Sequence, residues 1–394
     1  MSTEGWSSTA AWDMGIAANP IVVRAEAWEC PLPLAHVLRL GAVTYATRDY
    51  VVVRLTTDDG RQGHAVGYTR HTPLLAATKT VCEQLPNLGC DPVQVHEALR
   101  RRFAPGWSAL VRAASLIDVA LWDLRSQREG VPLARALGYD PRPVPAMAVA
   151  GYFSDRRSTG EQLDEIDRFV AEGYSTVKLI LPGHNAAADY DLVKKVRART
   201  PERVAIGVDF HGAFDTVPDA LVHCERLHDL GLRFLEDPFP SAEWHEVRDF
   251  AAVSSTPVAA GEDLPGLTAL MDLLDNGVTY LRADVTASGG YSVVRRAMTH
   301  AASLDAKFVP HVWPHIHAPL VAGAPDGSPV EVIPDYVGAD PVWLLLTEEP
   351  PMRDGLWHPP TASGLFLPLD HDAVRKYSTS CFTLDIVGAE MCMR

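Results

Sequence analysis

The sequence predicts an α/β protein in which a closed barrel of parallel strands follows an α+β region. After Pro143, short apolar runs alternate with segments of helical periodicity, and this alternation is typical of parallel βαβ units that close into a barrel. Before Pro143, strand-like runs precede a long helical pattern. We therefore expect a separate α+β domain ahead of the barrel.

The first domain is expected over residues 20–142, after a flexible N-terminal tail over residues 1–19 that is rich in small and polar side chains. Strands are predicted at 21–27 and 50–55, and the second leads into a turn at Asp58-Asp59-Gly60. A helix is predicted over 110–124, where apolar residues recur three and four positions apart.

The barrel is expected over residues 143–358. Strands are predicted at 144–149, 176–181, 204–208, 232–235, 258–260, 280–283 and 308–310. Helices are predicted between them at 161–172, 188–200, 218–230 and 291–304. The remaining segment, 359–394, contains two short apolar runs, and we expect it to pack back on the first domain.

Composition excludes several classes of protein. The 394 residues include 35 Lys and Arg against 50 Asp and Glu, a net charge of −15, and no basic run occurs, so nucleic acid is not an expected partner. No apolar run approaches the roughly 18 residues that a membrane span requires. The six cysteines form no C-x-x-C pair, as is typical of reduced thiols. These features predict a soluble, cytoplasmic protein.

Three carboxylates follow three successive predicted strands. Asp209, Glu236 and Glu262 each stand at a strand end, about one βα unit apart. The carboxyl ends of parallel barrel strands meet at one rim, so these side chains would repel one another unless a cation joins them. Oxygen ligands of this kind suit Mg²⁺. Any one of these acids alone is more typical of a helix cap or a loop salt bridge, but the regular spacing favours a metal site.

The next strand ends carry an acid and a histidine. Asp284 follows one predicted strand and His311 the next, and Glu331 lies at a further strand end. A carboxylate bonded to an imidazole fixes its tautomer and raises its basicity, which suits a general base near neutral pH. A single histidine is more often structural, but its place beside the metal rim favours a catalytic role.

These residues together resemble a known family. The positions that carry the resemblance are Lys178, Asp209, Glu236-Asp237-Pro238, Gly261-Glu262-Asp263, Asp284 with Gly289-Gly290, His311 and Glu331. The set is similar to the mandelate racemase subgroup of the enolase superfamily. Segments 117–124 and 130–133 also resemble the helical part of that family's capping domain. The resemblance implies a modified (β/α)7β TIM-type barrel under an N-terminal α+β capping domain.

The resemblance also implies a chemistry. One Mg²⁺ per subunit, or Mn²⁺ as an alternative, would be held by Asp209, Glu236 and Glu262. Asp237 and Asp263 directly follow two of these ligands, and adjacent side chains on a strand point apart, so both are expected to point away from the ligand set. A base removes the proton α to a substrate carboxylate, and the metal stabilises the enediolate. Asp284 and His311 would form the base, Glu331 would be a protonated hydrogen-bond donor to the enediolate, and Lys178 would bind the substrate carboxylate. The resemblance also implies that the protein forms a homo-oligomer.

One position departs from the family pattern. Where the family usually has the second lysine of Lys-x-Lys, this chain has Ile180, which cannot carry a proton. A two-base racemase needs proton-transfer groups on both faces of the substrate, whereas a dehydratase can work with one. This favours dehydration of a sugar acid to a 2-keto-3-deoxy acid. The alternative within the same family is a racemase, an epimerase or a lactone cycloisomerase. Two hypotheses from other functional classes are a Schiff-base aldolase that uses Lys178 and a non-catalytic barrel that only binds ligands.

Three further residues are candidates for the site. His211 lies two residues after Asp209 and shares its face, so it is either an acid–base residue, which would keep an epimerase possible, or a hydrogen-bonding neighbour of the metal ligands. His36 and Arg39 lie in a capping-domain loop. We expect them to contact hydroxyls or a distal carboxylate of the substrate, or to be incidental charges on an exposed loop.

Overall fold

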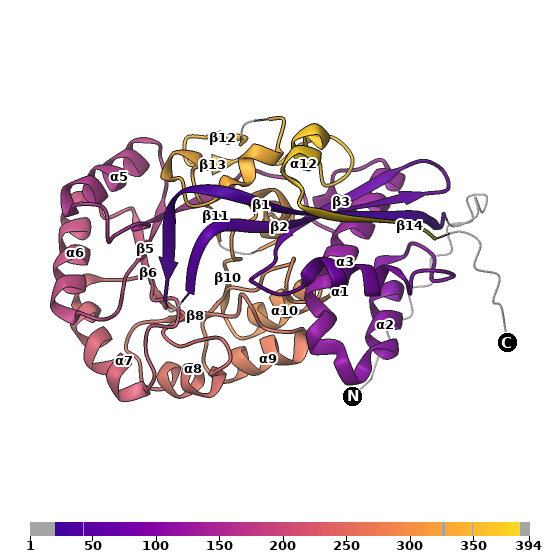
Figure 1. The fold of residues 1–394 in the computed structure, drawn as a ribbon. Helices are drawn as coiled ribbons and strands as arrows, with labels where there is room; N and C mark the ends of the chain where they lie inside the picture. The colour runs from indigo at the N-terminus through magenta and orange to yellow at the C-terminus, as the bar shows by residue number, and fades with distance from the viewer. Residues whose placement is uncertain (1–19, 42, 325–327, 349, 387–394) are drawn as a thin grey trace, which may run out of the picture.

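The computed structural model describes residues 20–41, 43–324, 328–348 and 350–386. The predicted tail at 1–19 lies outside these residues, as does 387–394 at the other end. The described chain forms a ring of helices around a parallel sheet, with an antiparallel sheet and further helices beside it (Figure 1). Among the described helices, none is both long enough and apolar enough to cross a bilayer.

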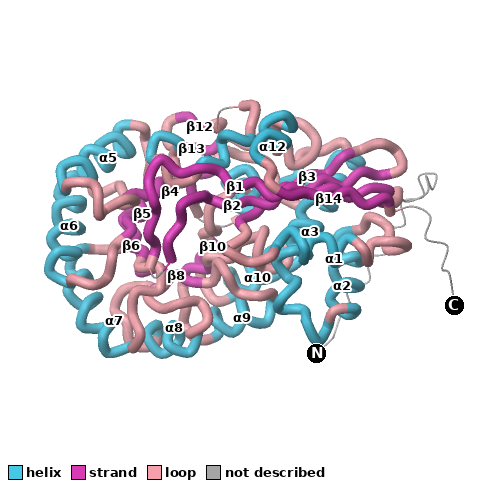
Figure 2. Tube along the Cα trace, in the orientation of Figure 1, coloured by secondary structure: helices cyan, strands magenta, loops and turns pink. Residues whose placement is uncertain are grey.

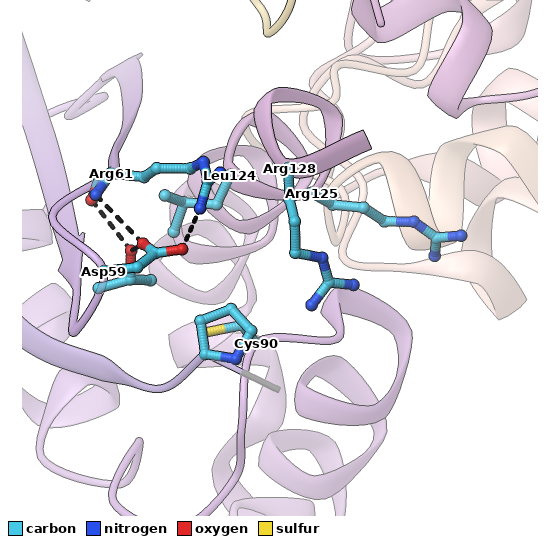
Figure 3. A pocket seen from close by; sticks show the side chains of 8 residues that line it. Asp59, Arg61, Cys90, Leu124, Arg125 and Arg128 are labelled. Carbon is cyan, nitrogen blue, oxygen red and sulfur yellow. Dashed lines mark hydrogen bonds and ion pairs between the residues drawn. The ribbon is translucent and has the colours of Figure 1, made fainter. Parts of the chain in front are cut away.

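The capping sheet has the strand order β14-β1-β2-β3, and all of its neighbours are antiparallel. Its strands are β1 (Val22–Leu40), β2 (Val43–Thr57), β3 (Gln62–Tyr68) and β14 (Ser380–Asp385). The first two run well beyond the predicted segments and form a long hairpin that reaches toward the barrel (Figure 1). The predicted turn between β2 and β3 is present, and there Oδ1 of Asp59 accepts hydrogen bonds from Thr57 Oγ1 at 2.6 Å and Arg61 N at 3.3 Å, while Arg61 also pairs with Asp59 (Figure 3).

Helices α1 (Leu74–Cys82), α2 (Pro92–Arg102), α3 (Trp107–Glu129) and α4 (Leu133–Ala136) complete the capping region. Helix α3 includes the predicted helix and is buried on most of its surface because it lies between the capping sheet and the barrel. Its contact with β3 is very close: a Cβ at Gly63 would lie 2.1 Å from the carbonyl oxygen of Ala120. A glycine is therefore required at this position.

The barrel has eight parallel strands in the described chain. They are β4 (Val144–Ala150), β5 (Thr176–Ile180), β6 (Ala205–Asp209), β7 (Phe234–Glu236), β8 (Val258–Ala260), β9 (Tyr280–Leu281), β10 (Lys307–Phe308) and β11 (Val330–Val332). Strands β4 to β10 pair in chain order, and β11 pairs with β4. Their buried, apolar character reflects coverage on both faces.

Seven helices connect these strands and form the outer ring (Figure 2). They are α5 (Thr159–Ala171), α6 (Ala186–Arg199), α7 (Val217–Cys224), α8 (Trp244–Ala251), α9 (Leu267–Asp275), α10 (Tyr291–Ser303) and α11 (Pro314–Val321). The predicted (β/α)7β architecture is confirmed. Sequence signals place helix starts well: Ser158 and Glu161 form a reciprocal capping box before α5.

The C-terminal part returns to the capping sheet. After 3-10 helices at Asp335–Val337 and Pro341–Leu345, the hairpin of β12 (Met352–Arg353) and β13 (Leu356–Trp357) adds to β4, and α12 (His371–Tyr377) follows. Strand β14 then pairs along β1. Within the described part of segment 359–394, β14 therefore lies against the capping sheet.

Candidate active site

The predicted strand-end carboxylates meet at one end of the barrel. Asp209 and Glu236 are the last residues of β6 and β7 and are direct neighbours in the parallel register. Glu262 follows β8 by two residues. All three side chains are buried. Three acids on adjacent strands, away from bulk water, form a concentrated negative charge that needs a cation.

An all-oxygen cluster in this group has the dimensions of a metal site. Glu236, Asp237 and Glu262 each offer an oxygen atom, and these atoms lie within 4.8 Å of one another. Burial, together with the neighbouring carboxylates, raises the pKa of Asp237 well above its usual value and raises that of Glu236. These residues fit a hard divalent cation such as Mg²⁺.

The cluster differs in detail from the expected ligand set. Asp237 was expected to point away, but the chain turns at this residue with φ +40° and its side chain joins the cluster. Asp209 stands beside the cluster, where its Oδ2 lies 2.8 Å from Lys178 Nζ and its Oδ1 lies 2.9 Å from His211 Nδ1. A residue directly after a strand end is not bound by the strand's alternation, so Asp237 reaches the cluster, and its place outside the ligand set stays a prediction.

Lys178 joins the carboxylates of three strands. Its ammonium lies 2.7 Å from Glu236, 2.8 Å from Asp209 and 3.1 Å from Glu331, and the residue is only 2% exposed. Burial by itself lowers the pKa of Lys178, but Asp209 and Glu236 outweigh it, so the pKa is raised. The amine therefore stays charged. A Schiff-base lysine needs a free amine, so this environment disfavours the aldolase alternative.

Arg282 is a second buried cation that sequence reasoning missed. It is fully buried, its Nε lies 3.0 Å from Glu236, and its guanidinium also pairs with Glu331. Nη1 donates to the carbonyl oxygens of Val309 and Pro310, at 2.8 and 2.9 Å. A charged residue inside the predicted strand 280–283 was a signal for this role, because a buried charge requires partners. Glu331 faces two cations here, and its role as a protonated donor stays a prediction.

His311 and Asp284 are brought together as predicted. His311 Nδ1 lies 3.0 Å from Asp284 Oδ2, while Asp284 Oδ1 accepts hydrogen bonds from the backbone and hydroxyl of Thr286 at 2.7 and 2.8 Å. Burial, followed by the charge of Arg70, lowers the pKa of His311 well below its usual value. Burial raises the pKa of Asp284 to about 7. With Nδ1–H assigned as donor to Asp284, the Nε2 atom of His311 carries no hydrogen and is an acceptor.

Two capping-domain arginines complete this side of the site, and neither was predicted. Arg70 Nη2 lies 2.8 Å from Glu262 Oε1 and 3.2 Å from His311 Nε2. Arg112, on α3, donates to Asp263 at 2.6 Å, and Asp263 also lies 3.4 Å from Arg70 Nε. Asp263 therefore points away from the acidic cluster, as expected, and anchors both arginines.

The β1–β2 hairpin contacts the rim of the barrel. Arg39 pairs with Asp155 at 3.2 Å, and the ring of His36 lies 5.9 Å from that of Phe153, both on the loop after β4. At the hairpin tip, a Cβ on Gly41 would lie 2.2 Å from the carbonyl oxygen of His211. The hairpin thus reaches the loop that carries His211, while the exposed His36 and Arg39 remain predicted substrate contacts.

Ile180 shares the inward face of β5 with Lys178, because side chains two residues apart on a strand point the same way. It is buried and stands beside Asp209 in the strand register. An apolar side chain therefore occupies the position where the family resemblance places a second lysine. Strands β5 and β10 lie on different sides of the barrel, separated by β6 to β9 on one side and by β4 and β11 on the other.

Comparison with known families agrees with this geometry. Residues 20–138 match the model of the mandelate racemase / muconate lactonizing enzyme N-terminal domain, and residues 161–373 match that of the enolase C-terminal domain-like family. The chain belongs to this family. The mandelate racemase-like resemblance inferred from the motifs is therefore confirmed across both the capping and the barrel regions.

Two relatives with named activities resemble the chain over most of its length. It is 26% identical to the L-talarate/galactarate dehydratase of Salmonella typhimurium, over 84% of this chain and 83% of that protein. It is also 26% identical to the D-galactarolactone cycloisomerase of Agrobacterium fabrum, over 85% of this chain and 93% of that protein. The first is a hydro-lyase and the second an isomerase.

The fold is shared with solved members of the family. The L-talarate dehydratase of a Polaromonas species, crystallised with Mg and L-glucarate, superposes with a TM-score of 0.83 at 23% identity. The superposition covers 93% of this chain and 99% of that one. This likeness confirms the capped TIM-type barrel.

Proposed function

We propose that this protein is a Mg²⁺-dependent sugar-acid dehydratase that converts its substrate to a 2-keto-3-deoxy acid. The observation that carries the proposal is the asymmetry of the site. His311, paired with Asp284, offers a proton acceptor on one side, whereas Ile180 offers none at the second-lysine position on β5. A single base suffices for elimination but not for two-base inversion. The dehydratases among the relatives support the same reaction class.

The acids at the strand ends would hold the metal. Asp209, Glu236 and Glu262 are the proposed ligands, and Asp237 lies close enough to contribute. Support comes from their burial and their oxygen-only donor set. When bound, Mg²⁺ supplies electrostatic stabilisation of the negative charge that collects on the substrate carboxylate as the α proton leaves. One ion per subunit is proposed, with Mn²⁺ as the alternative.

The chain's own residues supply the remaining steps. Lys178 remains charged and attracts the substrate carboxylate. His311 Nε2 accepts the α proton, while Asp284 holds Nδ1–H and stabilises the imidazolium that forms. The electron pair of the α C–H bond becomes a C=C bond, and the pair of the β C–O bond leaves with the oxygen. That oxygen takes the proton from His311, so water departs and the enol product becomes the 2-keto-3-deoxy acid.

An isomerase of the same family is the second candidate. The cycloisomerase among the relatives and the position of His211 beside Asp209 favour it. In that case proton transfer α to the carboxylate would occur without loss of water. Both candidates share the proposed metal, the base and Lys178, so only the products separate them.

A substrate screen tests the proposal. The protein is incubated with a panel of aldonic and aldaric acids, with Mg²⁺ and separately with EDTA, and 2-keto acid is measured. We expect keto acid from at least one compound with Mg²⁺ and none with EDTA. Full activity in EDTA would contradict the metal assignment. Epimer or lactone formation without keto acid would favour the isomerase.

A further inference from the structure

We propose that Arg70 acts on the leaving β-hydroxyl of the substrate and thereby directs the reaction to elimination. This inference rests on the proposed dehydratase function. Arg70 comes from the capping domain, just after β3, and its Nη2 lies 3.2 Å from His311 Nε2, the atom that takes the α proton. No other capping-domain side chain described above approaches that atom within hydrogen-bond distance.

The chemistry of the guanidinium limits what Arg70 does. An arginine side chain carries only donors and stays charged, so it cannot accept the proton itself. A substrate whose α proton approaches His311 Nε2 must bring its neighbouring atoms close to Nη2. The contact that Arg70 makes with the imidazole is then exchanged for a contact with a substrate oxygen, because a charged donor prefers a polarised oxygen acceptor.

The identity of that oxygen follows from the layout of the site. Lys178 lies on β5 and attracts the substrate carboxylate there, which leaves the hydroxyl oxygens for the side of His311. When one base both removes the α proton and protonates the leaving group, the β-hydroxyl lies on the same face as that proton. Arg70 therefore faces the departing oxygen. A hydrogen bond from its guanidinium stabilises the negative charge that develops on this oxygen as the C–O bond breaks.

The backbone conformation and the neighbouring side chains position the Arg70 guanidinium beside His311. Arg70 and His71 have φ values of +51° and +58°, a conformation that non-glycine residues adopt only at a cost. Asp263 forms an ion pair with Nε of Arg70 at 3.4 Å and accepts a hydrogen bond from Arg112, while Nη2 of Arg70 donates to Glu262 at 2.8 Å. The backbone conformation and these contacts together direct the Arg70 guanidinium toward His311. Strain of this kind is concentrated at functional sites.

The test is the ratio of α-proton exchange to elimination. An accepted sugar acid is incubated in D₂O with Mg²⁺, and both deuterium at Cα of the remaining substrate and 2-keto acid are measured. For Arg70→Met we expect elimination to fall by about 10²–10³-fold, as on loss of one charge-stabilising donor, while exchange continues. The exchange-to-elimination ratio should rise accordingly. Arg70→Lys should restore part of the elimination, and added guanidinium should partly rescue Arg70→Met.

Controls separate this role from a structural one. Arg100→Met, on the exposed face of α2 where Arg100 pairs with Glu97, should leave the ratio unchanged. If Arg70→Met lowers exchange and elimination in equal proportion, Arg70 does not act on the leaving group and the inference is wrong. A wild-type protein that forms no keto acid overturns the dehydratase function and this inference with it. Wild-type elimination with an unchanged ratio in Arg70→Met overturns the Arg70 role alone.

Discussion

His311 Nδ1 lies 3.0 Å from Oδ2 of Asp284, across the ends of the paired strands β9 and β10. Burial and the nearby arginines hold the pKa of His311 well below its usual value, so the imidazole is neutral at pH 7. A neutral ring whose Nδ1–H is engaged by a carboxylate presents Nε2 as an acceptor. In the proposed reaction, His311 and Asp284 together form the general base.

Replacing His311 should remove proton transfer. For His311→Asn we expect keto-acid formation to fall by about 10²–10⁴-fold, the range supplied by general acid–base catalysis. Exchange of the α proton in D₂O should be lost with it, because the same atom performs both steps. The matched control is His300→Asn, a half-buried histidine on α10 that contacts Asp275 away from the site. Undiminished turnover in His311→Asn would contradict the base assignment.

Replacing His211 should affect the metal rather than proton transfer. His211 Nδ1 lies 2.9 Å from Oδ1 of Asp209, so it orients a proposed ligand. Loss of such a partner typically weakens metal affinity by about 10–100-fold. For His211→Asn we therefore expect a higher Mg²⁺ requirement, measured by titration of activity, with elimination at saturating Mg²⁺ within about tenfold of wild type. A loss at saturation as large as that of His311→Asn would instead make His211 an acid–base residue.

Replacing Lys178 should lower the stability of the metal-free protein, because Lys178 balances the negative charge of three buried carboxylates. Lys178→Met leaves Asp209, Glu236 and Glu331 without their shared ammonium, and breaking a buried ion pair costs about 3–5 kcal/mol. We expect a lower melting temperature without metal and a larger rise on adding Mg²⁺ than in wild type. KM for the sugar acid should also rise. The control is Lys195→Met, on the exposed face of α6. If Mg²⁺ raises the melting temperature of Lys178→Met only as much as that of wild type, the result would argue against a shared cation site.

Asp118 predicts a specific pH dependence of stability. It lies buried on α3, its Oδ1 accepts from the backbone N–H of Ser292 at 3.2 Å, and burial raises its pKa from 3.8 to about 7. The folded protein therefore binds a proton that the unfolded chain releases, so the contribution of Asp118 to the free energy of unfolding falls as pH rises from about 4 to 7. Asp118→Asn lacks this titration.

The measurement is chemical unfolding of wild type and Asp118→Asn at pH 5 and pH 8. The variant should gain stability relative to wild type at the higher pH, by at most about 3 kcal/mol, because only the interval from pH 5 to about 7 contributes and one pKa unit corresponds to about 1.4 kcal/mol. The control is Asp167→Asn on α5, where Asp167 pairs with Arg199. It should show no pH-dependent difference in stability from wild type. A difference between wild type and Asp118→Asn that is the same at both pH values would show that Asp118 does not titrate in this range.

The barrel and its strand-end residues were predictable because parallel strands impose a period on the chain. Asp209, Glu236 and Glu262 follow strands at regular intervals, and the barrel brings all such positions to one rim. The same argument placed Asp284 beside His311. The strand boundaries were less accurate: the segment predicted at 280–283 is a strand only at Tyr280–Leu281, although the backbone N–H of Arg282 still donates to the carbonyl oxygen of Ala260 on the neighbouring strand at 2.9 Å.

The capping-domain contributions were not predictable in the same way. Arg70 contacts Glu262, 192 residues further along the chain, and no periodicity connects the two positions. Arg112 lies on a helix whose pattern indicates burial but not its partner. The docking of one domain on another decides these contacts. The approach of Asp237 to the acidic cluster was not predicted for a different reason: its backbone leaves the strand geometry on which the prediction depended.

The most direct test of the account follows one accepted sugar acid in D₂O to partial conversion, with analysis of both product and remaining substrate. We predict 2-keto-3-deoxy acid as the product. Any deuterium in the remaining substrate should be at Cα with the original configuration, because only the side of His311 transfers protons. Deuterated substrate with inverted configuration and no keto acid would contradict the one-base dehydratase and identify an epimerase.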